Sequence, residues 1–358
     1  MAPLPIPLDP YTLAAEEIPP ELRLEYYIAD LAAGPYQELL AGPFCWSPLE
    51  RLEGFLRQQP WPAEVRQRIA SARAASPAVE RRDGAIRGPV EQAEGVLLEP
   101  YVTLQAAEGG LVYLDRGVRL HSFTRLEAGP GETIYIGPDT VVGAGCCLQG
   151  DLCVGPGCRL LGADLRGPAQ IGPATVVERA VLQGPLAIGA HCEIRPGAYL
   201  RGNCLLGDAV IFRSEAKNVI LLDGVSDRHT AAGHYAYLGD SLLGRRVNLG
   251  AGTKTANLRL DRQIICVQVG RRRYLTGLRK FGAVLGDDVQ TGCLTVCDPG
   301  TLVGPRTWIY PGAYLRGSYP ADCLVKVHRV QEIVARSVTL PDEPPASGMH
   351  PTVSDPAG

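Results

Sequence analysis

The residues best suited to chemistry in this sequence gather around His234. Basic residues precede and follow it at Arg195, Lys217 and Lys280. A neutral imidazole accepts a proton near physiological pH, and a positioned base contributes roughly 10²–10⁴ to a reaction rate. Arginine and lysine side chains are the usual partners of phosphate groups. These residue types therefore suit proton transfer beside a phosphorylated molecule, whereas an isolated histidine is more often structural.

The elements that must position these residues follow a six-residue rhythm. Six is neither the helical period of 3.6 nor the alternation of two along a strand. It predicts a parallel β-helix, in which each hexad supplies one short strand and one corner. The first residue of a hexad should point into a narrow prism, and a small second residue such as Gly137 or Gly304 lets the backbone turn. The hexad residues of three runs are Ile136, Val142, Leu148, Val154 and Leu160; Ile188, Ile194, Leu200, Leu206 and Phe212; and Leu285, Thr291, Cys297, Val303, Ile309 and Leu315.

Composition narrows the classes of partner and compartment. The 358 residues carry 35 basic and 38 acidic side chains, so no bulk field favours nucleic acid or an anionic membrane. Residues 1–10 lack the features of a signal peptide, and no apolar run reaches membrane-spanning length. The eleven cysteines form no C-x-x-C pattern, and Cys146, Cys158, Cys192 and Cys297 fall where side chains should point inward. We expect reduced, buried thiols and a cytoplasmic location.

The chain should comprise three parts. Residues 1–95 are predicted to be a helical extension, with helices over about 21–40, over 47–58 (Ser47 as N-cap) and over about 63–75. Residues 96–325 are predicted to form the β-helix. Residues 326–358 should form a short helix and a disordered tail. The rhythm is lost at 218–233 and at 256–282, and such excursions from a rigid repeat are natural places for a site.

The stretches Val247–Thr253, Gly250–Arg259 and Thr276–Gly282, together with the run around His234, resemble the acetyltransferase domain of bifunctional N-acetylglucosamine-1-phosphate uridyltransferases. They resemble still more the archaeal and bacterial sugar-phosphate nucleotidyltransferases that carry the same C-terminal domain. The resemblance covers roughly residues 97–330 and does not extend to a nucleotidyltransferase domain. It implies a left-handed, homotrimeric β-helix that transfers an acetyl group from acetyl-CoA to a hexosamine-1-phosphate, glucosamine-1-phosphate foremost. It implies that no metal is needed, and the composition already argues against a nucleic-acid or membrane partner.

The resemblance also implies roles for single residues. His234 matches the general base that deprotonates the sugar amine. Arg195 and Lys217 match groups that hold the sugar phosphate. Further substrate-binding positions are Tyr237, Asn248, Asn257 and Lys280, and cofactor-binding positions are Ala251, Cys293 and Arg329.

Two departures and two alternatives accompany this interpretation. The spacing from Lys217 to His234 is longer than in the family, through residues 225–229, and residues 230–232 replace a lysine often found there. One alternative is a non-catalytic scaffold or sugar-phosphate sensor. The other is a γ-class carbonic-anhydrase-like enzyme that binds zinc through His191, His229 and His234, because the last two have the five-residue spacing of that class.

Overall fold

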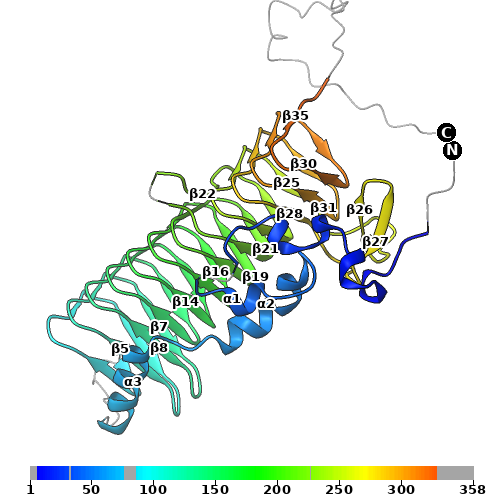
Figure 1. The fold of residues 1–358 in the computed structure, drawn as a ribbon. Helices are drawn as coiled ribbons and strands as arrows, with labels where there is room; N and C mark the ends of the chain where they lie inside the picture. The colour runs from blue at the N-terminus through cyan, green and yellow to red at the C-terminus, as the bar shows by residue number, and fades with distance from the viewer. Residues whose placement is uncertain (1–5, 32–33, 76–85, 226, 329–358) are drawn as a thin grey trace, which may run out of the picture. The chain divides into compact units, whose positions relative to one another are not determined.

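The computed structural model describes residues 6–31, 34–75, 86–225 and 227–328 (Figure 1). The chain divides into two units, residues 1–327 and 328–358, and the first contains all of the regular structure described below. The predicted tail and Arg329 lie outside the described residues.

Residues from 86 to 325 form a parallel β-helix with three faces, as the six-residue rhythm predicted. Face A consists of β1 (Ile86–Arg87), β4 (Thr103–Ala106), β7 (Arg125–Ala128), β10 (Cys147–Gln149), β13 (Asp164–Arg166), β16 (Val181–Gln183), the first halves of β19 (Tyr199–Leu206), β21 (Glu215–Leu221) and β23 (Tyr237–Leu243), then β25 (Lys254–Thr255), β30 (Val296–Cys297) and β33 (Tyr314–Leu315).

Face B consists of β2 (Val90–Gln92), β5 (Leu111–Leu114), β8 (Thr133–Ile136), β11 (Leu152–Val154), β14 (Ala169–Ile171), β17 (Leu186–Ile188), the second halves of β19, β21 and β23, then β28 (Ala283–Leu285), β31 (Thr301–Val303) and β34 (Ser318–Tyr319). Face C consists of β3 (Leu97–Leu98), β6 (Arg119–Leu120), β9 (Val141–Val142), β12 (Arg159–Leu161), β15 (Val176–Glu178), β18 (Glu193–Ile194), β20 (Val210–Phe212), β22 (Thr230–Ala232), β24 (Asn248–Leu249), β29 (Gln290–Thr291), β32 (Trp308–Ile309) and β35 (Leu324–Val325).

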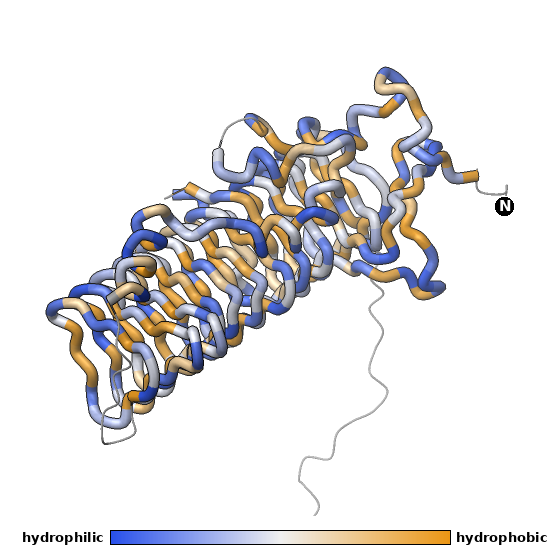
Figure 2. Tube along the Cα trace, turned by 90° about the horizontal axis from the view of Figure 1, so that it is seen from below, coloured by the Kyte–Doolittle hydropathy of each residue, from blue (hydrophilic) through white to orange (hydrophobic). Residues whose placement is uncertain are grey.

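The core of the β-helix is the column of inward residues that the hexads supply. Every hexad residue named from the sequence is buried. Leu148, Leu165 and Leu182 stack in register at intervals of 17 positions, close to three hexads per coil. Figure 2 shows these hydrophobic positions recurring along the tube. Small residues are required where coils approach closely: a Cβ added to Gly137 would lie 2.8 Å from the Val154 carbonyl oxygen of the next coil.

The N-terminal extension covers face B. Its elements are η1 (Pro10–Thr12), η2 (Ala15–Glu17), η3 (Pro20–Leu22), η4 (Leu24–Tyr26), α1 (Gln37–Leu40), α2 (Ser47–Gln58) and α3 (Ala63–Ala75). Trp46 and Leu52 from the extension share one buried cluster with outward-facing residues of face B such as Leu205, Ile220 and Leu242. α1 and α2 therefore lie against the strands (Figure 1).

The extension confirms two predicted helices and corrects the third. α2 and α3 have the predicted bounds, but Trp46 is the N-cap of α2 and Ser47 is already helical. Residues 21–40 were expected to form one helix. They form short 3₁₀ turns and the single turn α1, because Pro35 interrupts the backbone pattern and the apolar side chains, such as Leu24 and Leu39, are buried against face B.

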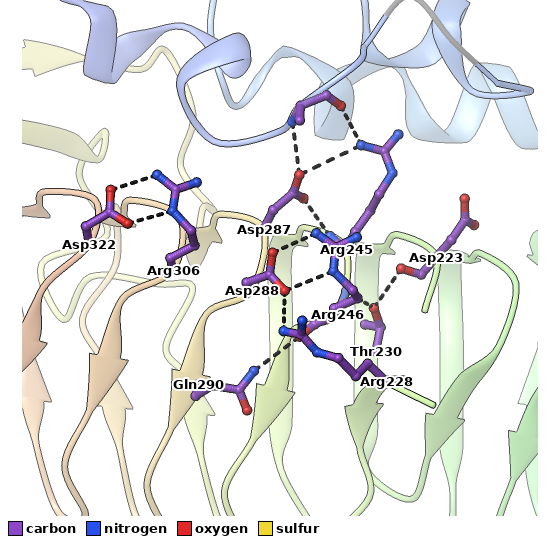
Figure 3. A network of polar contacts seen from close by, with 11 residues as sticks. Asp223, Arg228, Thr230, Arg245, Arg246, Asp287, Asp288, Gln290, Arg306 and Asp322 are labelled. Carbon is purple, nitrogen blue, oxygen red and sulfur yellow. Dashed lines mark hydrogen bonds and ion pairs between the residues drawn. The ribbon is translucent and has the colours of Figure 1, made fainter. Parts of the chain in front are cut away.

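A polar network fastens the extension and the first excursion to the coils (Figure 3). Asp287 accepts hydrogen bonds from the backbone N–H groups of Ala29 and Arg245 at 3.0 and 2.7 Å. Asp288 accepts two from Arg246 at 2.9 and 2.6 Å and pairs with Arg228 of the excursion. Burial raises the pKa of Asp287, whereas Arg246 lowers the pKa of Asp288.

The first excursion is shorter than the sequence indicated, and the second keeps its predicted bounds of 256–282 but contains regular structure. The first spans 222–229, because residues 218–221 and 230–232 belong to β21 and β22. The second contains an antiparallel hairpin of β26 (Cys266–Val269) and β27 (Arg272–Leu275), to which the backbone of Leu8 adds hydrogen bonds. No helix in the described part of the chain is long and apolar enough to span a membrane.

Candidate functional site

The corner between faces C and A carries His234. Backbone hydrogen bonds connect the successive coils there: Tyr235 N–H donates to the Arg213 carbonyl, Gly252 N–H to that of His234, and Leu294 N–H to that of Ala251. Each of these bonds is 2.8–2.9 Å long. The ladder therefore places the following residues at one corner in coil order: Arg195, Arg213, His234, Ala251 and Cys293.

His234 offers an exposed imidazole at this corner. It lies between β22 and β23, and its backbone carbonyl accepts the hydrogen bond from the N–H of Gly252. Its ring forms no hydrogen bond or ion pair with any residue that the structure describes. Both ring nitrogens are therefore open to a ligand, which is what a general base requires and a structural histidine lacks.

Two arginines flank the histidine. Arg195 pairs with Glu193 at 2.7 Å, and its Nη1 would lie 3.9 Å from a Cβ on Gly233, the residue before His234. The guanidinium of Arg213 stands 4.4 Å from the centre of the Tyr235 ring and donates a hydrogen bond to its hydroxyl. Sequence reasoning missed Arg213, although it occupies the same corner one coil earlier.

Face A brings together other predicted residues. Lys217 on β21 is in register with Gly239 on β23, and Tyr237 is in register with Glu215. Lys217 forms no ion pair within the described ranges, whereas Glu215 is paired with Arg201 at 2.7 Å. Burial raises the pKa of Tyr237. Lys217 is thus a cation without a counter-ion among the described residues, at the edge of face A next to face B and across face A from the corner of His234.

A buried carboxylate, also missed by the sequence reasoning, organises the edge of face A. Asp240 is 7% exposed and accepts hydrogen bonds from Nδ2 of Asn218 at 2.9 Å and from Nδ2 of Asn257. Asn218 accepts in turn from Asn203 at 3.3 Å. Asn218 and Asp240 both have left-handed backbones, with φ of 56° and 43°. The signal in the sequence is one acidic residue within the run Leu238 to Leu243, whose other residues are leucines, a glycine and a serine.

The remaining predicted residues are more dispersed. Asn248 is exposed on face C, in register with Ala231 and Gln290. Lys280 is exposed in the second excursion, where its backbone bridges to Leu258. Cys293 is the exposed one of eleven free cysteines. Cys293 shares the corner of His234 two coils further on, but no hydrogen bond or ion pair among the described residues joins the side chains of these three residues to His234.

The histidines of the zinc alternative do not converge within one chain. His191 and His229 lie at the corner between faces B and C, one strand away from His234. Nδ1 of His229 is 3.0 Å from the carbonyl oxygen of Ala209. In the described part of the chain, no three His, Cys, Asp or Glu side chains are placed to hold one metal ion.

Comparison with known proteins identifies relatives of this chain. No family model matches it. The bifunctional protein GlmU of Synechococcus elongatus is 30% identical over 202 residues, which cover 56% of this chain and 40% of that protein. A bifunctional sugar-1-phosphate nucleotidylyltransferase/acetyltransferase of Sulfurisphaera tokodaii is 36% identical over 125 residues, or 35% of this chain and 29% of that protein.

The chain thus spans well under half the length of these relatives. An Arabidopsis UDP-N-acetylglucosamine acyltransferase structure covers 68% of this chain and 72% of its own, at 13% identity and a TM-score of 0.20, which is too weak a likeness to carry function. By sequence, this chain is similar to bifunctional GlmU proteins over 56% of its length, and to a bifunctional sugar-1-phosphate nucleotidylyltransferase/acetyltransferase over 35% of its length.

Proposed function

We propose that this protein is an acetyl-CoA-dependent N-acetyltransferase that acts on a hexosamine-1-phosphate, with glucosamine-1-phosphate the first candidate. The names of the relatives support the reaction class. The observation that carries the proposal is the exposed, unpartnered imidazole of His234 between Arg195 and Ala251 on one corner of the coil. A sensor without turnover would need the cationic residues but not a free base.

The proposed reaction follows from these positions. His234 takes a proton from the amine as its nitrogen attacks the thioester carbonyl of acetyl-CoA, and the new C–N bond forms. The N–H of Ala251, one coil away, stabilises the oxyanion of the tetrahedral intermediate. The C–S bond then breaks, and the coenzyme A thiolate takes the proton back from the imidazolium. Cys293 and Arg329 complete the proposed acetyl-CoA site.

The phosphate of the sugar is assigned to Arg195 and Lys217. A phosphate dianion is held best by charge-assisted hydrogen bonds, and Lys217 has no counter-ion to release among the described residues. Arg195 must share its charge with Glu193. Tyr237, Asn248, Asn257 and Lys280 are assigned to the rest of the sugar and to the donor.

We further propose that the protein is a homotrimer whose clefts are formed by faces A and C. Face B is covered by the extension, so it is closed to a second copy. Exposed aromatic side chains lie on both faces and at the corner between them: Trp308 on face C, Tyr310 at the corner and Tyr314 on face A. Light scattering should give three chains per particle for the wild type and fewer for Trp308→Glu; a monomeric wild type would contradict this assignment.

The activity test uses acetyl-CoA with glucosamine-1-phosphate, followed by mass spectrometry of the sugar. Product mass is preferable to a thiol reagent, because the protein's own Cys293 is exposed. His234→Ala should lower kcat by about 10²-fold or more. The matched control is His191→Asn, an exposed histidine at another corner with φ of 56°, which asparagine tolerates.

The result has three informative outcomes. Acetylation that depends on His234 but not on His191 supports the proposal. Acetylation that survives His234→Ala refutes the assigned base. Binding of the sugar phosphate without turnover, for every amino sugar phosphate in a panel, would favour the sensor.

A further inference from the structure

A cavity lies between the N-terminal extension and face B, along one side of α3. Its volume is about 430 Å³, within the range of small-molecule sites. α3 lines it through Arg66, Ile69 and Arg73, whose spacing of three and four positions places them on one side of the helix. The coils line it from the other side, through residues such as Thr133 of β8 and the buried Leu186 of β17. The cavity therefore exists because α3 lies against face B.

The lining of this cavity carries an excess of positive charge. Three arginines line it: Arg57 near the end of α2, and Arg66 and Arg73 on α3. The one carboxylate in the lining belongs to Asp151. Arg66 and Arg73 form no ion pair with any residue that the structure describes. Arg57 pairs with Glu53 at 2.9 Å, but this exposed pair one helical turn apart is weak, so Arg57 can exchange it for a ligand.

Hydrogen bonds to neutral groups hold two of the guanidinium groups at the cavity wall. Arg73 donates to two backbone carbonyl groups of the coils and to the Thr133 hydroxyl at 2.8 Å, and Thr133 itself lines the cavity. Arg66 donates through Nε to the carbonyl oxygen of Trp61 at 3.1 Å, and Trp61 lines the cavity as well. Because a guanidinium has five N–H donors, both arginines keep donors for a ligand. Their positions are thus fixed, while their charges are not neutralised.

The remaining lining divides the cavity into a charged and an apolar part. The carboxylate of Asp151 accepts a hydrogen bond from the backbone N–H of Thr133 at 2.7 Å, on the side of the coils, and forms no ion pair within the described ranges. An anion should therefore lie on the α3 side, away from Asp151. Trp61, Ile69 and Leu186 supply apolar surface beside the arginines. This combination suits a ligand that has an anionic group and an apolar part.

We propose that this cavity binds a small organic phosphate, a phosphate monoester whose phosphate group is held by Arg66 and Arg73 and whose organic part packs against Trp61. Phosphate is favoured over carboxylate because it presents three acceptor oxygens, which suits arginines that come from two helices. The cavity lies on face B, whereas His234 lies at the corner between faces C and A. The site is therefore distinct from that of the proposed acetyl transfer, and the inference does not depend on that function.

The test measures the fluorescence of Trp61 in the full chain carrying Trp308→Phe. Of the three tryptophans, Trp46 is buried and Trp308 is exposed, so this variant leaves Trp61 as the indole that a ligand can contact. At constant ionic strength, phenyl phosphate should change this emission with a saturable dependence on concentration. It should bind about 10-fold or more tightly than benzyl alcohol, which lacks the charge, and more tightly than benzoate.

Substitutions of single arginines test the location. Arg66→Gln and Arg73→Gln should each weaken the binding of phenyl phosphate about 10-fold, as expected for the loss of a hydrogen bond between charged groups. The matched control is Arg51→Gln, because Arg51 is exposed on α2 and donates to the backbone carbonyl of Ala41, but does not line the cavity. Arg73→Gln also removes hydrogen bonds that fasten α3 to the coils, so Arg66→Gln decides the question if Arg73→Gln does not fold.

Three results would overturn the inference. Phenyl phosphate could leave the Trp61 emission unchanged, benzoate could bind as tightly as phenyl phosphate, or Arg51→Gln could weaken binding as much as Arg66→Gln. A preference for phenyl phosphate that is lost in Arg66→Gln and kept in Arg51→Gln supports it. None of these readouts is acetyl transfer, so failure here leaves the proposed function untouched.

Discussion

Replacement of Asp240 by asparagine should both destabilise the fold and disturb the proposed site. The buried carboxylate accepts from the amides of Asn218 and Asn257 at once. Asparagine keeps one acceptor oxygen and places an NH₂ group against the other amide donor. A hydrogen bond to a charged acceptor is worth about 1.5–3 kcal/mol, and relief from burying a charge offsets part of its loss. We expect the free energy of unfolding to fall by about 1–3 kcal/mol.

The same substitution frees the side chain of Asn257, which we place at the substrate. We therefore expect a raised KM for acetyl transfer in addition to the lost stability. Urea unfolding measures the stability, and Asp261→Asn is the control. That carboxylate is exposed, and its partners, Arg259 and the backbone N–H of Gln263, lie at the surface, so its replacement should matter little.

A double variant tests whether the hydrogen bond between the side chains at 240 and 257 causes these effects. In Asp240→Asn with Asn257→Asp, the new amide at 240 can donate to the new carboxylate at 257 and still accept from Asn218. Stability should recover, giving a coupling energy between the two positions. If Asp240→Asn unfolds like Asp261→Asn, or if the double variant is merely additive, the hydrogen-bonded arrangement is not what fixes Asn257.

Three further predictions concern the covered face, the network and the thiols. Ile220→Ala, under the extension, should cost about 2–5 kcal/mol in urea unfolding, whereas Leu260→Ala at a fully exposed site should cost under about 0.5 kcal/mol. The folded-state pKa of Asp288 is lowered, so its charge stabilises the fold above the unfolded pKa and this contribution is lost on acidification. The stability difference between wild type and Asp288→Asn should therefore shrink between about pH 6 and about pH 3. Iodoacetamide should modify one thiol per native chain rapidly, and Cys293→Ser should remove that fast phase. Rapid loss of several thiols would contradict the full or partial burial of the other ten cysteines.

The fold was predictable because the prism imposes one simple rule. Most inward residues are apolar and each corner must turn, so the six-residue spacing alone predicts the burial of residues such as Leu148 and Cys297. The extension was harder to predict, because its apolar residues between 21 and 40, such as Leu22, Tyr27 and Leu39, are buried by contact with face B and not on one side of an amphipathic helix. The spacing of apolar residues along the sequence predicts α2 and α3, because each helix has one apolar side. It does not predict the segment before them, which packs against the sheet without forming a long helix.

The site was less accessible to sequence reasoning because coil length is not constant. Leu165 follows Leu148 by 17 positions in the stack, Leu238 follows Ala216 by 22, and Cys297 follows Thr255 by 42. A resemblance to a family assigns roles to residues one at a time. Only the pairing of successive coils in the structure shows that Ala251 and Cys293 are neighbours and that Arg213 lies at the same corner. Asp240 shows the same limit from within a strand: its partners come from neighbouring coils, so its role is set by stacking and not by its own local pattern.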